Sequence, residues 1–176
     1  MTKDGPENLG IGPIVSSSQL ASGSMPAMSE MEYALTVASQ AFSKWMVRCM
    51  HAAGLSGLTP LEVQLLHSVN HRDREKTQAD LCTLLNIEDT HLVSYAIKKL
   101  VGLGLVTSGR RGKEKTVSIA DEGAQACERY KQVREALLIA SIRDIGLEEE
   151  DVSKVASMLR ALSGQYDQAA RGAASL

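Results

Sequence analysis

Residues 77–106, "TQADLCTLLNIEDTHLVSYAIKKLVGLGLV", decide the fold. Thr77 has the side chain of a helix N-cap and precedes a short apolar-periodic segment that ends at Leu85. The turn "LNIED" follows, and the next periodic segment predicts a second helix over residues 88–101, which the glycines of "GLGLV" end. Two helices joined by so short a turn are typical of a helix-turn-helix, whose second helix enters the major groove of DNA. We therefore expect residues 88–101 to be a recognition helix.

At 100° per residue, the predicted recognition helix has an apolar face and a polar face. The face expected to be buried holds Leu92, Val93, Ala96, Ile97 and Leu100. The opposite face carries side chains that donate hydrogen bonds or stack, as base reading requires: His91, Ser94, Tyr95 and Lys98. A solvated helix face would carry the same residue types, so the helix alone leaves both interpretations open.

A basic hairpin is expected after the recognition helix. Residues 105–108 and 115–119 can pair as strands around Gly109–Gly112, with glycines at both ends of the turn. A hairpin in this place is the wing of a winged helix, here residues 105–119. The side chains expected to contact the DNA backbone or a minor groove come from the hairpin and from the start of the first helix: Arg110, Arg111, Lys113, Lys115, Thr77 and Gln78.

Charge is unevenly distributed along the chain. Residues 91–119 contain six Lys or Arg and one acidic residue, Glu114, which gives this segment a net charge of +5. Since the whole chain carries a formal net charge of -2, the remainder carries -7. A single basic face on an acidic chain suits a protein that DNA attracts to that face alone, although a charged turn also serves solubility.

Apolar helical stripes flank the winged helix on both sides. "TPLE", residues 59–62, is a capping box and predicts a helix that buries Leu61, Leu65, Leu66 and Val69. Residues 29–54 predict a preceding helix with the stripe Leu35, Ala38, Phe42, Trp45, Cys49 and Ala52. Residues 121–170 predict two long helices, with the stripes Tyr130, Val133, Leu137 and Ala140, then Val152, Val155, Leu159, Leu162 and Tyr166. Exposing such stripes costs about 25 cal/mol per Å², so we expect 29–54 and 121–170 to form a two-fold homodimer.

With these elements in order, the chain resembles the MarR-type (multiple antibiotic resistance regulator-like) winged helix-turn-helix transcriptional regulators. The residues that carry the likeness are 77–106, the wing and "SIADEG" at 118–123, although the wing is short and lacks the family's usual Asp-Arg pair. The resemblance implies a mainly α fold with a small β-hairpin wing and long dimerisation helices. It also implies a sequence-specific regulator that binds double-stranded DNA as a homodimer, with room for a small-molecule effector of unknown identity.

The composition predicts one globular unit preceded by a tail. Gly, Pro and Ser supply twelve of the first 28 residues, so residues 1–28 are expected to form a tail. Residues 29–170 then form the winged-helix DNA-binding domain, with the winged helix itself at 59–120 between the flanking helices. Aromatic residues make up only 3% of the chain, which favours packed helices over a large sheet.

The cysteines and the absence of an apolar leader favour a cytoplasmic protein. The three cysteines are odd in number, far apart and each within an apolar-periodic segment, as expected of thiols in a reducing compartment. We find neither a signal peptide nor an apolar run long enough to span a bilayer.

Three alternatives remain beside the DNA-binding interpretation. A winged-helix protein-interaction module without DNA binding would have an apolar or acidic recognition face. A metal-responsive sensor could use His67 and His71, which are four residues apart but lack a third ligand nearby, and a redox-responsive sensor could use Cys49. We expect no metal, no cofactor and no catalytic residues, because the chain has no phosphate-binding glycine loop, nucleophile triad or paired carboxylates in a cleft.

Overall fold

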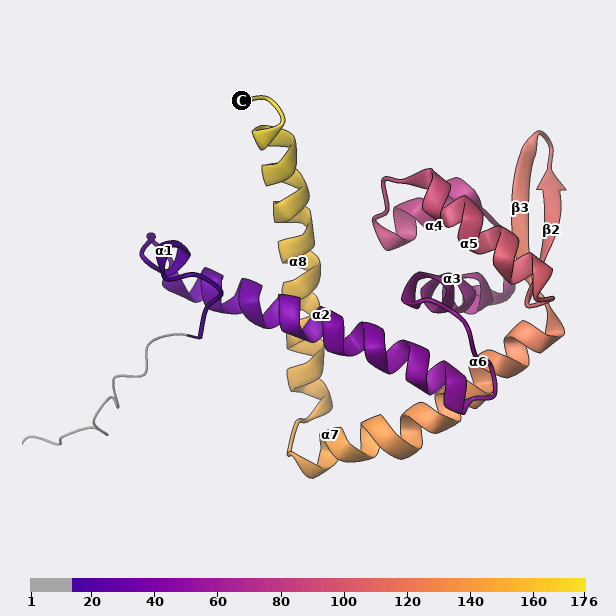
Figure 1. The fold of residues 1–176 in the computed structure, drawn as a ribbon, viewed down its shortest axis with the longest axis horizontal. Coiled ribbons are helices and arrows are strands. Elements are labelled where there is room, and N and C mark those ends of the chain that lie inside the picture. Colours follow the sequence, from indigo (N-terminus) through magenta and orange to yellow (C-terminus); the bar gives the residue numbers. More distant parts are fainter. Residues whose placement is uncertain (1–13) are drawn as a thin grey trace, which may run out of the picture. The chain divides into compact units, whose positions relative to one another are not determined.

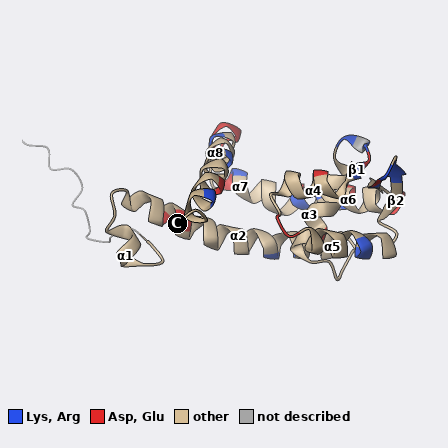
Figure 2. Cartoon of the chain, turned by 90° about the horizontal axis from the view of Figure 1, so that it is seen from above, with Lys and Arg blue, Asp and Glu red and all other residues tan. Residues whose placement is uncertain are grey.

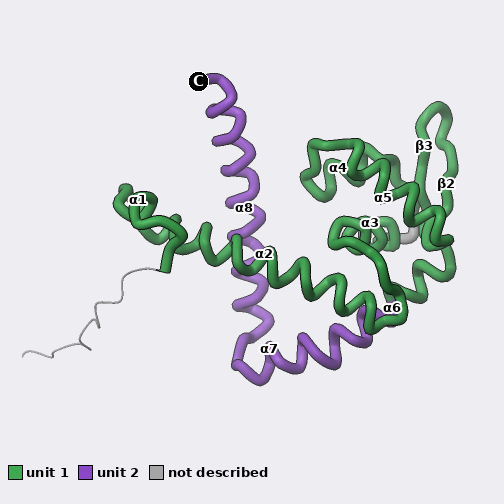
Figure 3. The backbone as a smooth tube through the Cα atoms, viewed as in Figure 1, with its two compact units in different colours: residues 1–127 green, residues 128–176 purple. Residues whose placement is uncertain are grey.

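The computed structural model describes residues 14–176, and the chain there is mainly helical with one small sheet (Figure 1). The predicted fold class is therefore confirmed. The chain divides into two units, residues 1–127 and 128–176 (Figure 3), which are described separately below. Residues 1–13 of the predicted tail lie outside the described residues.

The first unit contains most of the elements. They are α1 (Ser18–Ala21), α2 (Pro26–Ala52), α3 (Pro60–Asn70), a 3-10 turn η1 (His71–Asp73), β1 (Lys76–Thr77), α4 (Gln78–Leu85), α5 (Thr90–Gly102), β2 (Val106–Arg111), β3 (Glu114–Ile119) and the first part of α6 (Asp121–Arg134).

Only the C-terminal end of α2 contributes to the core of this unit. Its buried apolar residues are Met46, Cys49 and Met50, close to the place where α2 packs against α3. The N-terminal part of the predicted stripe is exposed in the single chain, with Leu35 at 37% and Phe42 at 53%, so its expected role in a homodimer stays a prediction. Among the described elements of the first unit, α1 and α3 make the main contacts with α2.

The capping box at the start of α3 is confirmed. The backbone N–H of Glu62 donates to the Thr59 hydroxyl (3.3 Å), and the backbone N–H of Thr59 donates to the Glu62 carboxylate (2.7 Å). Pro60 occupies the first turn, where its missing N–H costs nothing. Of the predicted stripe, Leu65, Leu66 and Val69 are buried, whereas Leu61 is half-buried.

Lys76 closes the other end of α3. Its side chain is buried, and its Nζ donates to the backbone carbonyls of Val69 (3.1 Å), His71 (2.6 Å) and Arg74 (3.2 Å). These bonds satisfy carbonyl groups that a helix end leaves without partners. The polar composition of residues 70–76 indicates a connection between helices. In the structure, however, Lys76 is buried and is the first residue of β1.

The three strands form an antiparallel sheet in the order β1-β3-β2. β1 contains two residues and pairs with β3 through Lys76 opposite Val117 and Thr77 opposite Thr116. The core beside the sheet comes from α3, α4, α5, the strands and the residue before β2: Val63, Leu65, Leu66, Val69, Leu81, Val93, Leu100, Leu105, Val106 and Val117. β1 was not predicted, because a two-residue strand has no periodicity of its own.

The wing hairpin is longer than predicted. Gly109 is not in the turn but in β2, where it pairs with Thr116, and the strands continue to the pair Arg111 and Glu114. The connection is therefore the two residues Gly112 and Lys113, with Gly112 at φ 64. A two-residue hairpin loop needs this left-handed conformation, which glycine adopts without strain.

A second glycine allows α6 to begin against the base of the wing. A Cβ on Gly123 would lie 2.0 Å from the carbonyl oxygen of Leu105, which is the residue before β2. The same carbonyl accepts the backbone N–H of Ala120 (3.1 Å). No other residue type fits here unless the backbone moves.

The second unit continues α6 into a π-helical turn η2 (Glu135–Ile139) and α7 (Ala140–Asp144), followed by α8 (Glu149–Ala173). The predicted stripe of α8 is largely exposed within this chain, with Val152 at 46%, Val155 at 51% and Leu159 at 41%. Leu137 of the preceding segment is 60% exposed. Across the described residues, no helix has both the length and the apolar character that crossing a membrane requires.

Candidate nucleic-acid interface

The helix-turn-helix is formed by α4 and α5, and local capping fixes where each begins. Thr77 caps α4 in a second capping box: its hydroxyl accepts the Asp80 N–H (3.0 Å), and its N–H donates to the Asp80 carboxylate (2.8 Å). α4 ends at Asn86, which has a left-handed conformation at φ 53 that asparagine tolerates better than most residues. Asp89 then caps α5 by accepting the His91 N–H (2.9 Å). The predicted recognition helix, residues 88–101, is therefore observed as Thr90–Gly102.

A side chain from α4 holds the N-terminal end of α5. The Gln78 amide nitrogen donates to the backbone carbonyl of Thr90 at 2.7 Å. Gln78 is half-exposed beside this bond. This hydrogen bond orients the Gln78 side chain, for which a contact with DNA was predicted.

An ion pair holds the C-terminal half of α5. Lys99 Nζ lies 2.8 Å from the Glu62 carboxylate of α3 and donates to the Gly57 carbonyl at 2.6 Å. Burial by itself would raise the pKa of Glu62. Hydrogen bonds from Lys99 and Thr59, together with the charge of Lys99, outweigh burial, so the pKa of Glu62 is lower than usual. Lys99 thus positions α5 and is not available as a free cation.

The exposed face of α5 agrees with the prediction except at one residue. His91, Tyr95 and Lys98 are exposed, and Ser94 is half-buried. Val93, Ala96 and Leu100 are buried as expected, and Ile97 is half-buried. Leu92 is a correction: it was expected inside, but 53% of it is exposed. At 100° per residue, Leu92 lies at one edge of the apolar stripe. The rest of the chain covers Val93, Ala96 and Leu100 but leaves this edge exposed.

Tyr95 and Lys98 form a pair on the exposed face. Lys98 Nζ lies 5.4 Å from the centroid of the Tyr95 ring, within the range of a cation–π interaction. Tyr95 is 70% exposed, so this contact limits the positions of its ring without covering it. Two of the predicted base-reading residues therefore lie next to each other on α5.

The wing places its cations on two faces. Arg110 lies directly opposite Lys115 in the β2–β3 ladder, and Arg111 lies opposite Glu114. Side chains alternate across a strand, so Arg110 and Lys115 share one face of the hairpin with Ser108 and Val117. Arg111 is on the other face, where its guanidinium lies 3.6 Å from the Glu114 carboxylate.

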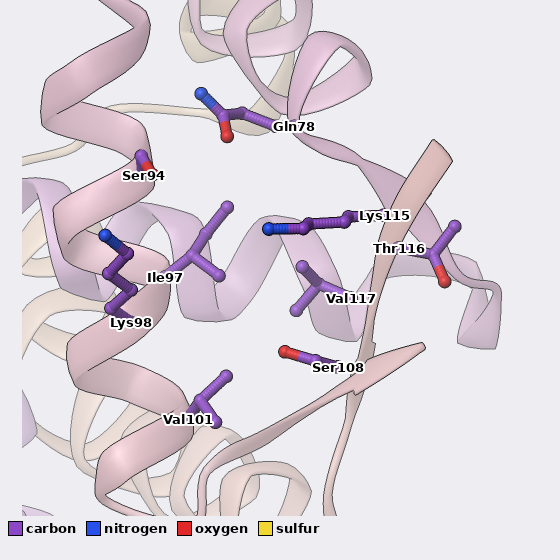
Figure 4. Close-up of a pocket in the computed structure, with 9 residues that line it drawn as sticks. All are labelled: Gln78, Ser94, Ile97, Lys98, Val101, Ser108, Lys115, Thr116 and Val117. Atoms are coloured by element: carbon purple, nitrogen blue, oxygen red, sulfur yellow. The ribbon is translucent and has the colours of Figure 1, made fainter. Parts of the chain in front are cut away.

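A hollow of about 240 Å³ lies between α5 and the wing (Figure 4). α5 lines it with Ser94, Ile97, Lys98 and Val101, and Lys115 extends toward it from β3. Gln78 lies at its α4 side. Three predicted DNA-contacting side chains from separate elements, Gln78, Lys98 and Lys115, therefore line a single concave surface.

Thr77 and Lys113, both predicted to contact the DNA backbone, do not line this hollow. Thr77 is buried as the cap of α4, so little of its side chain reaches the surface. Lys113 is exposed in the hairpin turn. Figure 2 shows Lys and Arg at the wing and on α5, where the sequence places the segment of net charge +5.

The residues considered for metal binding or redox sensing are not gathered in a site. His67 is half-buried on α3, and burial lowers its pKa, whereas His71 is exposed beyond the end of that helix. Cys49 is 1% exposed in the core, and burial raises the pKa of Cys127 to about 11. Within the described part of the chain, no three His, Cys, Asp or Glu residues are grouped as a metal would require.

Comparison with protein families finds a match over the helix-turn-helix and the wing. Residues 58–123 match the family described as winged helix DNA-binding domain. This range begins two residues before α3 and ends in the first turn of α6, and so includes α3, α4, α5 and the wing. No curated protein matches the chain.

Solved structures share the fold at low sequence identity. A MarR variant from E. coli complexed with operator DNA is 15% identical over 80% of this chain and 99% of its own, with a TM-score of 0.63. A MarR-family transcriptional regulator from Rhodococcus sp. RHA1 is 14% identical over 77% of this chain and 93% of its own, with a TM-score of 0.62. CouR from Rhodococcus jostii RHA1, bound to p-coumaroyl-CoA, is 15% identical over 75% and 90%, with a TM-score of 0.62. The fold implied by the resemblance is confirmed.

Proposed function

We propose that the chain is a sequence-specific DNA-binding transcriptional regulator, because residues 58–123 match the winged helix DNA-binding domain family and the chain shares its fold with MarR-family regulators. It binds duplex DNA as a homodimer, with α5 in the major groove and the basic wing on the adjacent backbone or minor groove.

The observation that carries this proposal is the surface shared by α5 and the wing. Lys98 from α5 and Lys115 from β3 line the same hollow, and Arg110 lies on the hairpin face that Lys115 occupies. This surface belongs to a segment of net charge +5 in a chain of net charge -2. Phosphate is the partner that such a local concentration of cations favours.

The residues of this surface have different roles in the proposal. His91, Ser94, Tyr95 and Lys98 face the base edges, because they occupy the exposed side of the recognition helix. Arg110, Arg111, Lys113 and Lys115 contact phosphates or the minor groove. Gln78 adds a backbone contact next to the first turn of α5, and Thr77 acts chiefly through the cap that places Gln78.

The flanking helices support a homodimer. α8 exposes an apolar stripe that includes Val152, Val155, Met158 and Leu159, and an exposed stripe of this kind is costly in water unless a partner covers it. A second copy is the simplest partner, since a two-fold axis would then present two α5 helices to successive major-groove segments. The proposed dimerisation segments are residues 29–54 and 121–170.

Selection from a random duplex library tests the proposal. The wild-type protein is expected to enrich a preferred sequence with two inverted half-sites about 10 base pairs apart, or a multiple of that spacing. Binding to the enriched duplex is then measured by fluorescence anisotropy against an unrelated duplex of equal length. A protein that enriches no sequence and binds no duplex would contradict the proposal and favour a protein-interaction module.

Two finer elements complete the proposal. A regulator of this kind works in the compartment that holds the DNA, which is the cytoplasm in a cell without a nucleus. CouR is bound to p-coumaroyl-CoA in its structure, and we extend from it only that this chain also responds to a small-molecule effector. A DNA complex titrated with candidate effectors would lose anisotropy if that extension holds.

A further inference from the structure

We propose that Leu92 is a specificity-determining residue that reads the C5-methyl group of a thymine in the major groove. This inference rests on the proposed function, because it needs α5 to enter that groove. Leu92 is 53% exposed, although its place in the helical periodicity predicted burial. Three neighbours on the same helix, Val93, Ala96 and Leu100, are buried normally.

Leu92 is part of a larger apolar surface on the exposed side of α5. Tyr95 follows three residues later, so the two side chains are neighbours on the helix surface, and Tyr95 is 70% exposed. Lys98 Nζ lies 5.4 Å from the Tyr95 ring centroid and limits how the ring can turn. An aliphatic side chain and an adjoining aromatic ring therefore stand out from the first two turns of the recognition helix.

The chemistry of the groove decides what such a surface contacts. Base edges in the major groove present hydrogen-bond donors and acceptors, and the thymine C5-methyl is the apolar group among them. Leu92 is the third residue of α5, and the N-terminal end of a recognition helix is the part that reaches base edges. The apolar partner that a base edge offers to Leu92 is therefore the thymine methyl group.

Charge favours DNA over a protein as the partner of this surface. Leu92 and Tyr95 are interleaved with His91 and Lys98, and the segment of residues 91–119 has a net charge of +5. A protein that covered both Leu92 and Tyr95 would also meet the Lys98 ammonium, which lies 5.4 Å from the Tyr95 ring centroid. On DNA, Lys98 remains among phosphates and base acceptors while Leu92 meets a methyl group.

The test removes thymine methyl groups one at a time from the duplex that wild-type protein enriches from the random library. Each thymine is replaced by deoxyuridine, which keeps its pairing and its O4 acceptor. For wild-type protein, we expect one thymine in each half-site whose methyl removal weakens binding about fourfold, the effect of one apolar carbon withdrawn from a contact. Leu92→Ala should bind the unsubstituted duplex more weakly and be insensitive to methyl removal at that same thymine.

Leu84→Ala is the matched control. Leu84 is 57% exposed, close to the exposure of Leu92, but lies on α4 and outside the proposed base-reading face. It should bind every duplex as the wild type does. Both leucines are exposed, so circular dichroism of the two variants should match the wild type.

Three results would overturn the proposal. In the first, methyl removal lowers the affinity of Leu92→Ala by the same factor as that of wild type at every thymine. In the second, methyl removal does not change the affinity of wild type at any thymine, and in the third, Leu84→Ala weakens binding as much as Leu92→Ala. The last result would assign Leu92 to a general apolar surface such as a protein contact. A wild-type protein that enriches no duplex would remove the proposed function together with this inference, whereas the other results leave DNA binding intact.

Discussion

Arg110 and Lys115 lie directly opposite each other in the β2–β3 hairpin, so two cations stand side by side on one face of the wing. Like charges in this arrangement destabilise a hairpin. Arg111, by comparison, lies opposite Glu114 and within 3.6 Å of its carboxylate. In the proposed function, the phosphates of bound DNA offset the repulsion between these two cations.

The two arginines should therefore behave differently when replaced. Arg110→Ala is expected to weaken binding to preferred and unrelated duplexes alike, and to reduce the slope of log affinity against log salt by about one, as the loss of one phosphate contact does. Arg111→Ala should have a smaller effect, because Glu114 already offsets its charge. Anisotropy titrations across a salt series measure both slopes. Equal slopes for the two variants and the wild type would mean that neither residue contacts phosphate.

The Glu62–Lys99 pair predicts a pH dependence of stability. The pKa of Glu62 is lowered in the folded chain, so its contribution to stability is complete above the ordinary value of 4.5 and is lost as the pH falls through the lower folded value. Glu62→Gln should remove that contribution, which makes the urea midpoint less sensitive to acid than in wild type. The midpoints are compared between about pH 6 and about pH 3. If the two proteins lose stability in parallel over this range, the ion pair does not hold α5 to α3.

Gly123 should be intolerant of a side chain. Gly123→Ala places a Cβ 2.0 Å from the Leu105 carbonyl oxygen, so α6 or the base of the wing has to move, at an expected cost of about 1–3 kcal/mol of unfolding free energy. Gly102→Ala is the control, because no atom lies within 4 Å of the added carbon and its backbone is helical. Urea denaturation of both variants measures the difference. A loss as small in Gly123→Ala as in the control would show that the close approach at Leu105 is not required.

Polar residues in the stripe of α8 should prevent dimerisation. Leu159 is 41% exposed in the single chain, and Leu162, one turn further along, is half-buried. Changing both to glutamate should give monomers in sedimentation velocity, while circular dichroism shows that the helices remain. Ser153→Glu, at an exposed polar position of α8, is the control and should stay dimeric. A wild-type protein that sediments as a monomer would contradict the proposed homodimer.

The parts of the fold that sequence predicted are those governed by neighbours in the chain. Thr59 and Thr77 cap helices through bonds three residues away, so their role is readable from spacing alone. The same holds for the turn that Asn86 begins, since it depends on a local backbone conformation.

The parts that sequence missed depend on distant neighbours. Leu92 lies at the edge of its apolar stripe, and only the way α5 packs decides whether it is covered. Lys76 is a polar residue whose partners are three backbone carbonyls at the end of α3, which no pattern of side chains reveals. β1 exists only because β3 pairs with it. In the interface, the sequence named the side chains, but their division between two faces of the wing required the strand register.

Contacts between α5 and base edges should affect the affinity for one sequence, whereas electrostatic attraction to phosphates should affect the affinity for every duplex. His91 and Tyr95 are both exposed on α5 and about 6 Å apart along its axis at 1.5 Å per residue. His91→Ala and Tyr95→Ala should each cost about 1–3 kcal/mol at the preferred duplex and should relax the preference at different base pairs. Binding to unrelated duplexes should remain nearly unchanged.

The most direct test is the ratio of affinities for the preferred and an unrelated duplex, measured at one fixed salt concentration for wild type, His91→Ala and Tyr95→Ala. Recognition by α5 predicts that this ratio falls about fivefold or more in each variant while the affinity for the unrelated duplex holds. If both affinities fall by the same factor and the ratio stays constant, these side chains belong only to a basic surface, and α5 does not read the sequence.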